Sequence, residues 1–191
     1  MTNAAPSAPS WATAGVALVA CAHGTADPEG QKAVEQLRAR IAELLPGVDV
    51  LEASVDVQQP SLDDVVAELA AKGRRCVVVP LLLSAGYHVF HDIARTVAAA
   101  GGLARASGAL GPDDALVALL DRRLSEAGVA PDAPVVLGAA GSSDARAVRD
   151  VEKVAARLAE LRGAPVTPGY LSAAQPRVEA VVTAGPGGVD G

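Results

Sequence analysis

The chain has 191 residues and a formal net charge of −6, and half of its residues are hydrophobic although only 2% are aromatic. This composition fits one globular domain, or one domain with an additional fragment, whose core is built from Ala, Val and Leu. The acidic balance and the lack of a basic run argue against nucleic-acid binding. No apolar run reaches the ~20 residues that a membrane-spanning helix needs. Residues 1–14 do not resemble a signal peptide, so we expect a cytoplasmic protein.

Apolar runs and helical patterns alternate from residue 16 onward. Residues 1–14, rich in Ala, Pro and Ser, are expected to form a disordered leader. The patterns then predict strands at about 16–22, 48–57, 76–83 and 103–106, and helices at about 28–45, 61–71, 91–100 and 113–127. This alternation predicts an α/β fold over residues 15–127, with a parallel sheet between two layers of helices.

A second, shorter set of elements repeats the first. Strands are predicted at 135–139 and 166–172, with a helix at 145–162 between them and a short helix after Pro176. The segment 23–27 (His-Gly-Thr-Ala-Asp) aligns with 140–144 (Ala-Gly-Ser-Ser-Asp), and Gln59-Pro60 aligns with Gln175-Pro176 at nearly the same offset. Nothing after residue 182 matches the third strand. We therefore predict a truncated repeat over 131–182 that has lost its histidine, and a disordered tail over 183–191.

The three histidines of the chain follow two of the predicted strands. His23 follows the first strand, whereas His88 and His91 follow the third, and Asp56 ends the strand predicted between them. Parallel strands bind ligands at their carboxyl ends, so we expect His23, His88 and Asp56 to share one cleft as metal ligands. Imidazole suits divalent iron, cobalt, nickel and zinc. The alternative for each histidine is a helix-capping or core position, and His91 is expected in the first turn of a helix, away from the metal.

The two cysteines, Cys21 and Cys76, both lie within predicted strands. Their number and spacing exclude a zinc cage or an iron–sulfur cluster. They are interpreted as buried small hydrophobes in a reducing compartment. A redox-active pair on neighbouring strands is the alternative.

Several motifs together resemble the class II chelatases of the sirohydrochlorin cobalto- and ferrochelatase type. The resemblance covers about 15–127, continues more weakly to 182, and rests on four segments: 22–25 (AHGT), 59–62 (QPSL), 77–93 (VVVPLLLSAGYHVFHDI) and 110–113 (LGPD). It implies that His23 and His88 bind the metal and take part in its insertion. It also implies that the acidic residue at the end of the second strand belongs to the same metal site. This residue is usually Glu and is Asp56 here. Gly24, Thr25, Ser84 and Gly86 would lie at the substrate.

The same resemblance implies a tetrapyrrole substrate and a divalent metal, cobalt or ferrous iron, that is inserted and is not a permanent cofactor. Insertion removes two pyrrole protons and needs a base, which neutral histidine can supply. Such a tetrapyrrole is rich in carboxylates, and Arg95 is the candidate cation to hold one; its alternative is a solvated helix position. A metal carrier or regulator is the alternative function. The unpaired strand edge and apolar helix faces expected of residues 131–182 favour a homodimer.

Overall fold

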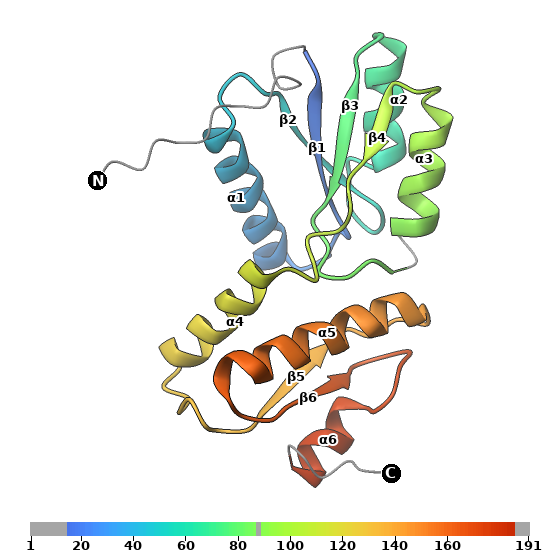
Figure 1. Ribbon diagram of the computed structural model, residues 1–191. Helices are drawn as coiled ribbons and strands as arrows, with labels where there is room; N and C mark the ends of the chain where they lie inside the picture. Colours follow the sequence, from blue (N-terminus) through green and yellow to red (C-terminus); the bar gives the residue numbers. More distant parts are fainter. Residues whose placement is uncertain (1–14, 87–88, 186–191) are drawn as a thin grey trace, which may run out of the picture. The chain divides into compact units, whose positions relative to one another are not determined.

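The computed structural model describes residues 15–86 and 89–185 (Figure 1). The predicted leader and His88 therefore lie outside the described residues, as does the tail from residue 186. The chain divides into two compact units, the first comprising Met1–Leu82 and His88–Gly108, and the second Leu83–Tyr87 and Ala109–Gly191. Among the described residues, no helix is both long enough and apolar enough to cross a membrane.

The first unit is built on a parallel sheet whose four described strands lie in the order β2-β1-β3-β4. The strands are β1 (Ala17–Ala22), β2 (Val50–Ser54), β3 (Cys76–Pro80) and β4 (Ala104–Ala106). All six residues of β1 are buried, because it is flanked by strands on both edges and by helices on both faces. This arrangement confirms the predicted fold class.

Helices cover both faces of this sheet (Figure 1). Alternate β1 residues, among them Val19 and Cys21, pack with α2 (Leu62–Ala71) and with Ile93, at the start of α3 (Ala94–Ala99). The intervening residues Leu18 and Ala20 pack on the other face against α1 (Pro28–Leu44). Three layers therefore form because a strand with apolar residues at every position has two faces to bury.

The ends of several elements differ from the sequence prediction for local reasons. The strand predicted at 76–83 ends at Pro80. Its neighbour β4 ends opposite Val78, and proline has no N–H to donate to a further partner in the ladder. The predicted helix at 91–100 begins instead with a π-helical turn, Val89–Ile93, before α3. The strand predicted at 48–57 ends at Ser54, since Val57 takes a positive φ of 44° in the turn that follows.

The second unit contains the predicted repeat and an additional helix. Its elements are α4 (Asp114–Glu126), β5 (Val135–Ala139), α5 (Ala145–Arg162), β6 (Val166–Tyr170) and α6 (Val178–Ala184). The two strands pair in parallel, and both α5 and α6 contact β6. Helix α6 extends to Ala184, so the first residues of the tail predicted at 183–191 are helical.

Helix α4 groups with the second unit, whereas the sequence assigns 113–127 to the first domain. The reason is a pair of links to α5. Arg162 donates from Nη1 to Asp121 Oδ1 at 2.8 Å, and Arg157 Nη1 lies 3.0 Å from Asp114 Oδ1. The Arg162 side chain is almost fully buried, so this ion pair is part of the unit's interior.

The backbone of the second copy reproduces that of the first in detail. Gly24 and Gly141 take φ values of 97° and 90°, and an isolated bridge joins β2 to Ser61 as another joins β6 to Arg177. Asp27 caps α1 by accepting from Glu29 N and Gly30 N, and Asp144 caps α5 by accepting from Arg146 N. The internal repeat predicted from two short matches is therefore a repeat of the turns as well as of the elements.

Candidate functional site

His23 and Asp56 lie side by side in the backbone at the carboxyl edge of the first sheet. His23 follows β1, Asp56 follows β2, and the Asp56 N–H donates to the His23 carbonyl at 2.9 Å. Both residues are exposed. The parallel ladder thus continues past the strands and brings together two of the three residues predicted to bind a metal.

The geometry around the His23 ring favours one tautomer. Nδ1 lies 3.3 Å from the Gly24 carbonyl oxygen, which can only accept, so a neutral ring protonated at Nδ1 would donate to it. In that tautomer Nε2 holds the ring's lone pair, which is what a metal ion or a pyrrole proton requires. The Asp56 carboxylate is oriented locally, since Oδ1 accepts from the Val57 N–H at 2.8 Å.

Gly24 makes the close approach of the two strand ends possible. Its φ of 97° is one that residues with a side chain rarely adopt. A Cβ on Gly24 would also lie 2.0 Å from the Asp56 carbonyl oxygen. Any side chain here would push the His23 turn away from the end of β2, so the predicted substrate-site residue Gly24 has a structural role that the structure shows directly.

Thr25 is held by two glutamines that sequence reasoning did not single out. Its N–H lies 3.3 Å from Gln58 Oε1, and its carbonyl accepts from Gln31 Nε2 at 2.8 Å. Gln58 also donates to Glu52 Oε1 of β2 at 3.2 Å, which ties the turn back to the sheet. The only sequence signal was the position of Gln58 directly before the Gln59-Pro60 match.

Ser84 and Gly86 belong to the second unit, together with α5. The Ala85 N–H between them donates to Asp150 Oδ2 at 3.0 Å, and the Gly86 N–H to the Ser84 carbonyl at 3.2 Å. His88, which comes two residues later, lies outside the described residues. Its predicted convergence with His23, and the substrate roles of Ser84 and Gly86, stay predictions.

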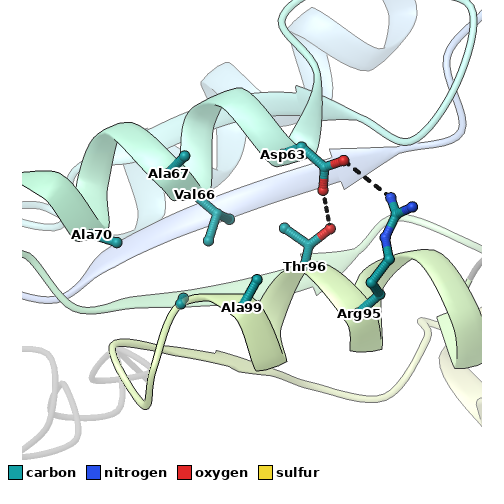
Figure 2. A pocket seen from close by; sticks show the side chains of 8 residues that line it. Asp63, Val66, Ala67, Ala70, Arg95, Thr96 and Ala99 are labelled. Atoms are coloured by element: carbon teal, nitrogen blue, oxygen red, sulfur yellow. Dashed lines mark hydrogen bonds and ion pairs between the residues drawn. The ribbon is translucent and has the colours of Figure 1, made fainter.

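Arg95 lies on α3 and faces α2. Figure 2 shows its guanidinium beside Asp63, with Nη2 3.0 Å from Asp63 Oδ2, while the other Asp63 oxygen accepts from the buried Thr96 hydroxyl. Apolar residues of both helices, such as Val66 and Ala99, line the groove below this pair. Because Asp63 balances its charge, Arg95 offers less attraction to a carboxylate than a lone cation would, and its substrate role stays a prediction.

His91 lies in the π-helical turn and is exposed, in agreement with a position at the start of a helix. Within residues 15–86 and 89–185, no group of three or more His, Cys, Asp and Glu side chains could hold a metal ion. The described part of the first unit contains two of the three predicted ligands, His23 and Asp56, and their metal-binding role stays a prediction.

The second copy lacks counterparts of both predicted ligands. Ala140 stands at the position of His23, and Ser172 stands at that of Asp56, because the Ser172 N–H donates to the Ala140 carbonyl at 2.9 Å. The second copy thus has the same turn without the histidine and the aspartate.

Both cysteines are free and buried, in agreement with the interpretation as small hydrophobes. Burial raises the pKa of the Cys21 thiol to about 12 and also raises the pKa of Cys76. In the parallel register Cys21 faces Pro80 and Cys76 faces Ala17. The two thiols are four residues apart along the strands, roughly 13 Å, so the alternative of a redox pair was wrong.

Comparison with known proteins identifies the family of this chain. The CbiX family model matches residues 17–127 and 134–185. The chain belongs to the CbiX family. This confirms the family resemblance seen in the motifs, and the two matched segments of this CbiX protein contain the first copy and the repeat. No curated protein matches the sequence significantly.

Three solved structures show the fold of this CbiX protein. SirB from Bacillus subtilis with Fe3+ matches with a TM-score of 0.75 at 24% identity, over 87% of this chain and 69% of SirB. The sirohydrochlorin chelatase SirB from Bacillus subtilis subspecies spizizenii in complex with cobalt matches with a TM-score of 0.68 at 22% identity, over 80% and 65%. CbiX, the terminal enzyme for biosynthesis of siroheme in denitrifying bacteria, matches with a TM-score of 0.61 at 24% identity, over 82% and 69%. The chain thus spans about two thirds of the length of each.

Proposed function

We propose that this CbiX protein is a chelatase that inserts a divalent metal, cobalt or ferrous iron, into sirohydrochlorin on the route to cobalamin or sirohaem. The observation that carries the proposal is the backbone pairing of His23 and Asp56 at the carboxyl edge of the sheet. Family membership and a fold shared with SirB and CbiX support it. In this proposal the metal is a substrate and not a resident cofactor.

Insertion exchanges a divalent cation for two pyrrole protons, so the site must bind a metal weakly and accept protons close to it. His23 Nε2 can do either, since a neutral imidazole is both a ligand and a base. The Asp56 carboxylate, whose backbone pairs with that of His23, would add a negative charge that favours the metal cation and the departing protons. His88 completes the proposed set as second imidazole.

The carboxylates of the tetrapyrrole must be accommodated by a chain of net charge −6. Gly24, Thr25, Ser84 and Gly86 are the proposed contacts, together with Arg95 if a substrate carboxylate displaces Asp63. A cytoplasmic location is part of the same proposal.

The test is an insertion assay with the purified chain, sirohydrochlorin and either Co2+ or Fe2+, following the change in tetrapyrrole absorbance. Insertion above the rate without protein is expected. Metal binding by calorimetry without insertion would instead support the alternative of a carrier or regulator. Absence of both activities would contradict both functions.

A further inference from the structure

An exposed apolar side chain directly follows Asp56 in the turn after β2. We propose that this residue, Val57, is a substrate-binding residue whose branched side chain lies against the apolar face of the tetrapyrrole ring. Val57, His23 and Asp56 all belong to the first unit. The inference deepens the proposed function and rests on its substrate.

The backbone conformation of Val57 is unfavourable for a valine. Its φ is 44°, and the Gln58 N–H donates to the Asp56 carbonyl across it at 2.5 Å. A three-residue turn with a positive φ is the rare and strained form of the γ-turn, and a β-branched side chain at positive φ adds steric strain. Glycine or asparagine would take this conformation at a lower cost in free energy.

The valine side chain contributes little to folding in return for this strain. Val57 is 68% exposed, so most of its apolar surface stays in water. A single exposed hydrophobic residue is ordinary on a protein surface, but exposure together with a strained backbone is not, because both oppose folding. Strain of this kind is concentrated at functional sites, so a function is the remaining reason for a valine here.

The internal repeat shows that the turn itself does not need a valine. The offset that aligns the two Gln-Pro pairs places Ala173 at the position of Val57, and Ala173 is also exposed, with a φ of 53°. A hydrogen bond of 2.6 Å between its two neighbours closes the same three-residue turn. Alanine therefore suffices for this backbone, and the larger apolar side chain stands in the copy that also has His23 and Asp56.

The position of Val57 fits the ring of the proposed substrate. The Asp56 N–H donates to the His23 carbonyl, and the Val57 N–H donates to Asp56 Oδ1 at 2.8 Å, so Val57 adjoins the two groups proposed to act at the ring centre. A base that takes pyrrole protons must face the flat side of the macrocycle, which is apolar, whereas the carboxylates lie at its periphery. Covering an exposed apolar side chain with that face removes both surfaces from water, which favours binding.

The experiment measures the Kd of metal-free sirohydrochlorin for the full chain by titration of its absorbance, together with insertion kinetics and melting temperatures. Val57→Ala removes two methyl groups and introduces the residue of the second copy. Val57→Asn is polar and tolerates a positive φ, whereas Val57→Leu keeps an apolar side chain. Leu44→Ala is the matched control, since Leu44 is 63% exposed and lies at the end of α1 that is remote from the His23 turn.

Val57→Ala and Val57→Asn are expected to raise the Kd roughly 5- to 30-fold, the affinity that two buried methyl groups supply. KM should rise with the Kd while kcat changes little, since an apolar contact with the ring binds substrate and transition state alike. Val57→Leu and Leu44→Ala should bind as the wild type does. Wild-type affinity in both the Ala and the Asn variant would overturn the inference, and so would an equal loss in Leu44→Ala.

Stability and ring binding keep the inference separate from the proposed function. The melting temperatures of Val57→Ala and Val57→Asn should equal or exceed that of the wild type, because strain is relieved; a clear fall in both would assign the valine to folding and overturn the inference. If the wild-type chain binds sirohydrochlorin without inserting metal, the proposed insertion fails and the Kd values still decide on Val57. If it does not bind sirohydrochlorin, the inference falls together with the proposed substrate.

Discussion

His23 and Asp56 are brought together by their backbones, and their side chains remain at the surface. A ladder hydrogen bond joins the two residues, and Gln58 and Gln31 hold the adjoining turn. Removing either side chain should leave the backbone of this site in place, because neither His23 nor Asp56 packs in the core. Substitutions here should separate chemistry from stability.

His23→Ala should lower the insertion rate by roughly 10²- to 10⁴-fold, the usual contribution of a positioned base. The melting temperature should change little, since the side chain is exposed. His91→Ala is the matched control, an exposed histidine of the π-helical turn, and should have the milder effect. Initial rates and circular dichroism, measured on the same samples, test this, and a wild-type rate in His23→Ala would contradict the assignment.

Neither cysteine should react with an aromatic disulfide reagent at pH 8 in the folded protein. The nucleophile is the thiolate, and a pKa of about 12 for Cys21 leaves almost none of it at that pH. Both thiols should react at once in concentrated guanidinium. Fast labelling of Cys21 in the native protein would show that β1 is not buried as described.

The sequence reveals residues of a rare and reactive type, such as histidine after a strand. It does not reveal common polar residues whose importance comes from their burial or from their partners in space. A histidine after a strand is conspicuous, whereas Asp150 on a helix is indistinguishable from a solvated aspartate until its burial is known. Gln58 is likewise an ordinary loop residue until its amide is seen to link Thr25 with Glu52. Long-range partners of this kind, 33 and 65 residues away, leave no trace in local patterns.

At the scale of elements, patterns predicted every strand and helix of the described chain, and errors were confined to their ends. Val135–Ala139 and Ala145–Arg162 occur where the sequence places them, since an apolar run and a long amphipathic period are strong local signals. The π-helical turn and the early end of β3 depend on neighbours in space. The assignment of α4 to the second unit depends on Arg162, whose burial no pattern predicts.

The turn after β1 can be tested with a pair of glycines. Gly24→Ala and Gly47→Ala both place a side chain at positive φ, but only the first meets an obstacle, the Asp56 carbonyl at 2.0 Å; Gly47 has nothing within 4 Å. Both variants should lose roughly 1–3 kcal/mol from the backbone, and Gly24→Ala should lose roughly 1–3 kcal/mol more from overpacking. Unfolding in urea measures both, and equal losses would contradict the close approach of the turn to β2.

The cap of α5 predicts a pH dependence of stability. Hydrogen bonds from Arg146 hold the pKa of Asp144 down at about 2, below the ~3.9 of an unfolded aspartate. Its contribution is therefore complete above about pH 4 and is lost as the pH falls towards 2. Asp144→Asn keeps a capping oxygen but not the charge, so it should melt a few degrees below the wild type at pH 7 and together with it near pH 2. A difference in melting temperature that does not vary with pH would exclude the ion pair as its cause.

At the scale of the whole molecule, the two sheets differ in how far they are completed. Within the described residues, β1 has a partner on each edge, whereas β5 pairs with β6 alone. The edge of β5 that faces away from β6 can pair with a strand from another chain. We therefore expect the protein to dimerise through the second copy. Light scattering at micromolar concentration tests this. A monomer that inserts metal at full rate would show that self-association is not needed.

Gly141 separates what the turn needs for folding from what it would need for chemistry. The second copy has Ala140 and Ser172 at the positions that His23 and Asp56 occupy in the first. It nevertheless has the glycine, and a Cβ at position 141 would lie 1.8 Å from the Ser172 carbonyl oxygen. The turn therefore needs its glycine whether or not a histidine precedes it. In a His-Gly pair after a strand, the glycine is thus a signal of the turn alone, and only the histidine is a signal of chemistry.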